Sequence, residues 1–146
     1  MDKHTIMFIK GSLIYLFLGV TAGLALTLKS WTWAPGWLEY FPLVHGHLIL
    51  FGCVMMLIFG VAYHILPRFS GKQLYSTRLA VIHFWLSNIG LIGMLIFFPL
   101  LWKSGKEVFA MGLFISGMAA GTGIYIFIYN IWKSISTLKE AVVPRR

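Results

Sequence analysis

Four long apolar runs divide the sequence, and polar positions gather in the short segments between them. The runs cover residues 6–28, 42–66, 77–101 and 108–132. Each is long enough to cross a bilayer as a helix, which takes roughly 20 apolar residues. Because the connections are short, consecutive helices are expected to pack as antiparallel neighbours. The pattern predicts an all-α integral membrane protein, with residues 1–146 forming a single domain, a four-helix transmembrane bundle.

Composition supports a membrane protein over a soluble one. Hydrophobic residues make up 59% of the chain and charged residues 11%, whereas soluble domains are about one quarter charged. The first run is longer than the apolar core of a signal peptide, and no A-x-A-like site follows it, so we expect this helix to be retained. The single cysteine, Cys53, lies in the second run and is interpreted as a small packing residue.

The net charge of +8 raises the question of a nucleic-acid partner. The distribution of the basic residues argues against it, because nine of the twelve fall at one end of the predicted bundle. This asymmetry is typical of the cytoplasmic side of membrane proteins. We therefore predict no nucleic-acid binding, a location in the inner (cytoplasmic) membrane, and both termini in the cytoplasm. The nine residues are Lys3, Lys10, Arg68, Lys72, Arg78, Lys133, Lys139, Arg145 and Arg146.

Each predicted helix carries small residues that form a groove. Lipid offers no hydrophobic drive between helices, so close contact relies on such residues. Helix packing is the commoner use of a groove, but a partner subunit or a flat cofactor would also fit. The glycine pairs are Gly19 and Gly23, Gly52 and Gly60, Gly90 and Gly93, and Gly117 and Gly121.

Two of the five histidines, His45 and His47, lie one residue apart near the outer end of the second helix. Ionisable residues inside a span usually face the bundle or a cavity. At roughly 100° per residue, His45 shares a face with Gly52 and Met56, which leaves room for the edge of a porphyrin. His47 points to a bulky apolar side that faces lipid or a second helix layer. A regular helix therefore cannot bring both to one small site, and His45 is the better candidate for an axial haem ligand.

The other histidines are weaker candidates. His83, in the third helix, is a candidate for a second site, or else bonds a carbonyl or Asn88. His64 lies at the inner interface and ranks lower as a ligand, and His4 is expected to be solvated. An electron-carrying haem usually has two axial ligands. The second ligand would be Met111, at matching depth on the fourth helix, or a residue of a symmetric partner chain.

The stretch that begins "HGHLILFGCVMMLIFGVAYHILPRFSG" and continues through "HFWL" resembles the second and third helices of subunit I of the haem-copper oxidases. The likeness is closest to the cbb3-type oxidases and the nitric oxide reductases. The resemblance implies that the chain corresponds to the first four helices of that subunit. It also implies a low-spin haem ligand at His45 or at His47, because the spacing to "LPR" fits one subfamily from each.

The resemblance has limits that shape the functional hypotheses. The later helices of a full subunit I carry the copper histidines, the high-spin haem ligand and the second low-spin ligand, and they have no counterpart here. The leading hypothesis is a membrane protein with one or two b-type haems that transfers electrons, as a homodimer or a subunit of a respiratory complex, rather than a complete oxidase. Its electron partner would be a protein or a quinone.

Two alternatives stay open. One is a cofactor-free structural or assembly subunit of an oxidase complex. The other is a protein that binds copper or nitric oxide through the His45–His47 pair, with Met56 beside it.

Overall fold

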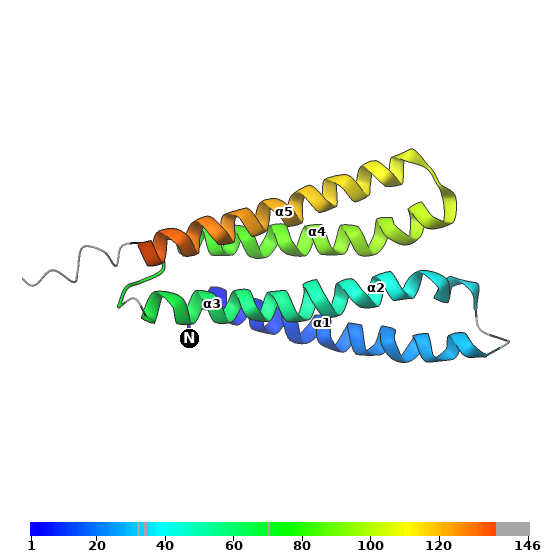
Figure 1. The fold of residues 1–146 in the computed structure, drawn as a ribbon, viewed down its shortest axis with the longest axis horizontal. Helices are drawn as coiled ribbons and strands as arrows, with labels where there is room; N and C mark the ends of the chain where they lie inside the picture. The colour runs from blue at the N-terminus through cyan, green and yellow to red at the C-terminus, as the bar shows by residue number, and fades with distance from the viewer. Residues whose placement is uncertain (32, 34, 70, 137–146) are drawn as a thin grey trace, which may run out of the picture.

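The computed structural model describes residues 1–31, 33, 35–69 and 71–136, and Figure 1 shows the fold. Among these residues, four helices are long and apolar enough to cross a membrane. This confirms the predicted all-α transmembrane bundle. The spans run over Lys3–Ser30, Gly36–Phe69, Thr77–Ser104 and Glu107–Ser136.

The spans are built from several helical elements. The first is α1 (Lys3–Thr27) with one 3₁₀ turn, η1 (Leu28–Ser30). The third and fourth are single helices, α4 (Thr77–Ser104) and α5 (Glu107–Ser136). The second span joins four elements end to end, namely η2 (Gly36–Tyr40), α2 (Phe41–His47), η3 (Leu48–Met55) and α3 (Met56–Phe69).

The second span is not the regular α-helix that the sequence analysis assumed. Its middle, η3, is a π-helix, in which each amide bonds five residues back instead of four. A π-helix has more residues per turn, so 100° per residue is not the angle that applies within it. His45, Gly52 and Gly60 nevertheless all lie against α1, on one side of the second span.

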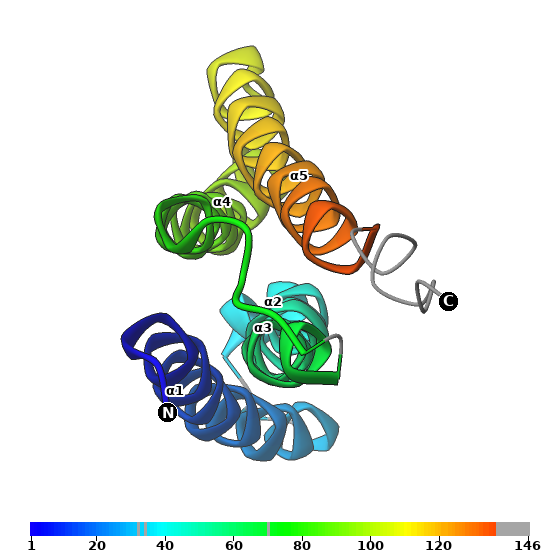
Figure 2. The same cartoon turned by 90° about the vertical axis from the view of Figure 1, so that its left-hand side faces the viewer.

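The bundle consists of two helix pairs. In Figure 1, α1 lies beside the α2–α3 span and α5 lies beside α4. The α4–α5 pair makes the most extensive contact in the molecule, and α3 also contacts α5. Figure 2 shows α5 crossing obliquely, close to α3 at one end and away from it at the other. We call the end where α1 begins and α3 ends the basic end, because Lys3, Arg68, Lys72 and Arg78 lie there.

Small residues set the close helix approaches. A Cβ added at Gly90 would lie 2.6 Å from the backbone nitrogen of Ala120, so α4 and α5 meet backbone to backbone there. Gly60 similarly admits Phe8 of α1. Gly117 and Gly121 differ, because an added Cβ at either has no described atom within 4 Å. This pair of glycines on α5 is therefore not used for packing among the described residues.

The best-buried part of the core lies toward the basic end. Phe8, Phe59, Tyr63 and His83 are each at most 2% exposed, and the ring of Phe127 packs against the last three. These aromatic rings come from α1, α3, α4 and α5, and so join the two helix pairs.

Candidate functional site

The imidazole of His45 is held by the backbone of α1. Its Nδ1 lies 2.8 Å from the carbonyl oxygen of Gly19. A carbonyl oxygen only accepts hydrogen bonds, so Nδ1 carries the proton and donates. The other ring nitrogen, Nε2, then keeps its lone pair, which is the form of histidine that binds a metal.

The glycine pair of α1 makes room for this ring. A Cβ added at Gly23 would lie 2.9 Å from Cε1 of His45 and 3.2 Å from Nδ1. One turn earlier, Gly19 admits the side chain of Ile49. The groove predicted from Gly19 and Gly23 therefore receives the second span and, at the end far from the basic end, the imidazole itself.

His47 turns to the other helix pair. Its Nδ1 lies 2.9 Å from the carbonyl oxygen of Leu43, one turn back in α2. Its ring centroid is 5.0 Å from that of Phe98 in α4. Of the two surroundings expected for His47, the structure places it against a second helix. Its Nδ1 is also the donor, so Nε2 again keeps a lone pair.

Both histidines line one cleft beside α2. The cleft has a volume of about 720 Å³, within the usual range of ligand sites, about 300–1,000 Å³. Most of its wall is apolar, and Met94 of α4 contributes to it. The two histidines thus share a cleft although they contact different helices. The remaining lining residues are Pro42, Leu43, Gly46, Ile49, Leu50, Phe51 and Met55.

Gly52 does not line this cleft. A Cβ added there would lie 2.7 Å from Tyr15 of α1 and 3.0 Å from Leu91 of α4. The space beside Gly52 is therefore filled by side chains of the protein. The room expected there for a porphyrin edge is occupied in this structure by Tyr15 and Leu91.

His83 is buried in the aromatic core. Its side chain is fully buried, and its Nδ1 lies 3.0 Å from the hydroxyl oxygen of Tyr63. Its Nε2 has no hydrogen-bond partner among the described residues. Asn88, the partner considered from the sequence, instead accepts from the hydroxyl of Tyr15 at 2.6 Å.

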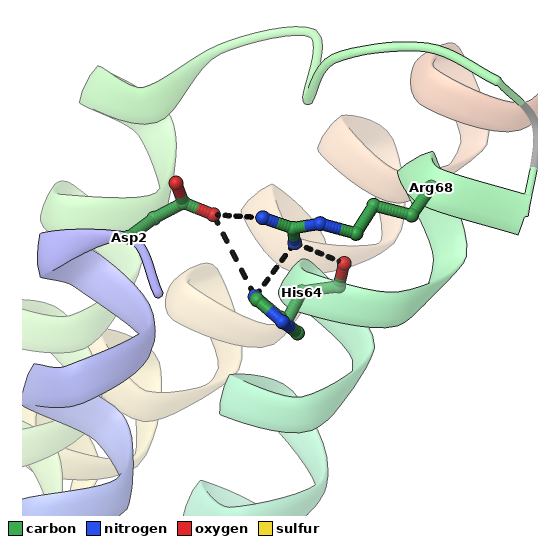
Figure 3. A network of polar contacts seen from close by, with 3 residues as sticks. All are labelled: Asp2, His64 and Arg68. Atoms are coloured by element: carbon green, nitrogen blue, oxygen red, sulfur yellow. Dashed lines mark hydrogen bonds and ion pairs between the residues drawn. The ribbon is translucent and has the colours of Figure 1, made fainter.

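His64 lies in a different environment from His83, at the surface of the basic end (Figure 3). The guanidinium of Arg68 donates to Nδ1 of His64 at 2.6 Å and also contacts Oδ2 of Asp2 at 3.3 Å. Because Nδ1 accepts from Arg68, the 3.7 Å approach of Asp2 to the same nitrogen is a near contact and not a hydrogen bond. The structure does not bring His64 and His83 to one site.

Met111 and His4 also differ from their expected settings. Met111 is 60% exposed on α5, and the structure does not bring it to His45, which lies against α1.

His4 was expected to be solvated, and that is wrong. It belongs to α1 and is only 5% exposed, because its ring packs edge-on against Tyr63 at a centroid distance of 5.8 Å.

No group of three or more His, Cys, Asp or Glu residues that could hold a metal ion occurs within residues 1–31, 33, 35–69 and 71–136. His45 and His47 are each held through Nδ1 by a backbone carbonyl and lie beside the same apolar cleft. Fold and site together describe a multi-pass membrane protein with two candidate histidine ligands at one cleft.

The chain belongs to the cytochrome c and quinol oxidase polypeptide I family, whose sequence model matches residues 3–138. It is a short relative of haem-copper oxidase subunit I, as the resemblance in the sequence implied. No solved structure matches it.

The chain is similar to part of several longer relatives. It is 30% identical over 113 residues to a putative cytochrome c oxidase subunit 1-beta of Streptomyces avermitilis, covering 66% of this chain and 19% of the relative. It is 32% identical over 118 residues to a probable cytochrome c oxidase subunit 1-alpha of Streptomyces coelicolor, covering 72% and 20%. A cbb3-type cytochrome c oxidase subunit CcoN1 of Stutzerimonas stutzeri is 26% identical over 127 residues, covering 66% and 26%. The chain thus spans about a fifth to a quarter of these relatives.

Proposed function

We propose that the protein is a b-type cytochrome of the inner membrane that transfers single electrons, with His45 as an axial ligand of its haem. The observation that carries the proposal is the 2.8 Å contact between Nδ1 of His45 and the Gly19 carbonyl. Histidines that bind metals almost always donate their other ring nitrogen in this way. Membership of an oxidase subunit I family supports haem as the group that His45 would bind.

The residues around His45 fit a haem. The Gly19 carbonyl sets the tautomer and orientation of the imidazole, and Gly23 leaves the space in which the ring sits. The cleft beside α2 offers an apolar wall to a flat macrocycle. When bound, a haem supplies a one-electron couple whose potential depends on its axial ligands and its surroundings. One haem per chain is the expected number at this cleft.

The second axial ligand has two candidates. His47 lines the same cleft and keeps an unprotonated Nε2. Met111 is exposed on α5, where it is accessible to a neighbouring protomer. A homodimer or a respiratory complex would place such a neighbour beside the haem, with the basic end in the cytoplasm. The electron partner would be a protein or a quinone.

A structural or assembly subunit of an oxidase complex is the second candidate function. The observation that favours it is the face of α5 at Gly117 and Gly121, which no described residue covers. In addition, the chain spans only about a fifth of its oxidase relatives. Under this hypothesis the helices of a larger subunit would cover α5, and no haem would be needed.

Purification from cells with ample haem distinguishes the two functions. The cytochrome proposal expects haem in near-stoichiometric amount and sharp α and β bands after reduction with dithionite. Metal analysis of the same sample tests the copper alternative, which expects copper without haem. A folded protein with no haem would contradict the cytochrome proposal and favour the structural role.

A further inference from the structure

A polar pocket lies at the basic end, between the start of α1, the end of α3 and the start of α4. It has a volume of about 400 Å³. Six of its lining residues carry side-chain hydrogen-bond donors and one, Asp2, is a carboxylate. The six donors are His4, Tyr63, Arg68, Lys72, Gln73 and Thr77.

One of these donors is buried without a partner. The side chain of His4 is 5% exposed, and its Nε2 has no hydrogen-bond partner among the described residues. Buried polar atoms are usually hydrogen-bonded, and His4 is one of the residues that line the pocket, so a ligand or ordered water there would supply the missing partner. Arg68 of the same pocket donates through Nη1 to Nδ1 and to the carbonyl oxygen of His64, both at 2.6 Å, and through Nη2 to Asp2 at 3.3 Å (Figure 3). The Asp2 contact is the longest of the three and is the one that a ligand anion would replace.

The charge around the pocket favours an anion. A second cleft of about 670 Å³ shares Asp2, His4 and Thr77 with the first. The two together are lined by four basic side chains and one carboxylate. Basic pockets between transmembrane helices bind the headgroups of anionic lipids, and arginine suits phosphate because its donors form a planar fork. The four basic residues are Lys3, Arg68, Lys72 and Arg78.

The second cleft adds an apolar wall to this basic pocket. It continues from Thr77 along α4 past Val81 and Ile82, and the side chain of Ile82 is 47% exposed. A polar pocket that opens into an apolar cleft along a helix matches a molecule with a charged head and a hydrocarbon chain. A free phosphate ion would use the first cavity alone.

We propose that this composite pocket binds an anionic phospholipid, with its phosphate between His4 and Arg68 and an acyl chain along Val81 and Ile82. The lipid phosphate takes over Arg68 from Asp2 and accepts the hydrogen bond that Nε2 of His4 otherwise lacks. The site is independent of the haem cleft, which lies at the other end of the bundle.

The test measures how much phosphatidylglycerol the full-length protein retains after detergent purification from vesicles of phosphatidylglycerol and phosphatidylcholine. Native mass spectrometry reads the lipid bound per chain. The expected result is retention of phosphatidylglycerol over phosphatidylcholine by the wild type. Arg68→Gln is expected to weaken retention about tenfold, the size of one charge-assisted hydrogen bond. Lys103→Gln, at the opposite end of α4, is the matched charge control and is expected to retain the lipid.

Two further variants keep the result independent of folding. His4→Phe keeps a ring beside Tyr63 but removes the donor, and is expected to weaken retention about threefold to tenfold. Asp2→Asn removes the carboxylate that competes for Arg68, and is expected to strengthen retention. Circular dichroism confirms the helical content of each variant.

Several results would overturn the proposal. One is equal retention of both lipids by the wild type, and another is equal retention of phosphatidylglycerol by Arg68→Gln, His4→Phe and Lys103→Gln. A third concerns the source of the phosphate. If millimolar inorganic phosphate displaces the lipid fully and Ile82→Asp has no effect on retention, the pocket is a site for free phosphate and not for a lipid.

Discussion

His45 and His83 both lie inside membrane-spanning helices, yet their burial and their hydrogen-bond partners differ. His83 is fully buried among aromatic rings, and its Nδ1 faces the hydroxyl of Tyr63. His45 is half-buried, bonds a backbone carbonyl and lines an open cleft. The comparison shows that burial alone does not identify a ligand. A candidate ligand needs one nitrogen held and the other facing space, and His45 meets this condition better than His83.

Removing each histidine should separate a packing role from a binding role. His83→Ala leaves a cavity between four helices, and we expect it to lower the free energy of unfolding by about 3 kcal/mol. In haem-free protein, His45→Ala loses mainly one hydrogen bond, so about 1 kcal/mol is expected. Equilibrium unfolding in mixed micelles, followed by circular dichroism, measures both. Equal losses for the two variants would remove the distinction.

A second change targets the space beside His45 without touching the histidine. Gly23→Val places atoms where the imidazole lies, and overpacking of this kind costs about 1–3 kcal/mol. Gly117→Val, on the uncovered face of α5, is the matched control and is expected to change stability by less than about 0.5 kcal/mol. Gly23→Val should also lower haem content, whereas Gly117→Val should not. Unchanged stability and haem content in Gly23→Val would show that the ring does not depend on this glycine.

Losing the hydrogen bond of His83 should destabilise the protein less than losing the volume of its side chain. Tyr63→Phe removes the hydroxyl that lies 3.0 Å from Nδ1 of His83, and we expect a loss of about 1 kcal/mol. His83→Phe keeps an aromatic ring in the core and should cost far less than His83→Ala. A double-mutant cycle of Tyr63→Phe and His83→Phe measures the coupling between the two residues. Coupling near zero would mean that the contact contributes nothing.

The surface contact between Asp2 and Arg68 should have the smallest effect on stability. Burial raises the pKa of the Asp2 carboxyl, but the charge and hydrogen bond of Arg68, together with the charges of His4 and His64, outweigh this and hold the pKa below its usual value. A lowered pKa adds stability above the usual value, about 3.9, and this stability is lost as the pH falls below it. Since the pair is half exposed, the effect should be at most about 0.5 kcal/mol. The free energies of unfolding of wild type and Asp2→Asn should therefore differ at pH 6 and converge as the pH falls to about 3.

The fold was predictable because the length and hydropathy of an apolar run identify a membrane-spanning helix. The four apolar runs became four spans, extended by a few residues at their ends. The π-helix at Leu48–Met55 was not predictable, because a change of hydrogen-bond register depends on packing against other helices and leaves no mark in residue type. The filling of the space beside Gly52 was missed as well, because it comes from side chains of two other helices, Tyr15 and Leu91.

The candidate site was predictable in part. The position of His45 against a glycine-bearing helix follows from its face in α2, which ends before the π-helix begins. The role of the Gly19 carbonyl was missed, because no sequence pattern tells which backbone oxygen a side chain will reach. The burial of His4 was missed for a similar reason, since it depends on Tyr63 of α3 lying beside the start of α1. A histidine in the first turn of an apolar helix was the one available signal.

Chemical rescue of His45 tests the central claim most directly. In the His45→Ala protein, the α band of the dithionite-reduced spectrum should be lost, and added imidazole should restore it by entering the space that the side chain leaves. In the His83→Phe protein the α band should be present without imidazole. An unchanged α band in His45→Ala, with no response to imidazole, would contradict the assignment of His45 as the haem ligand.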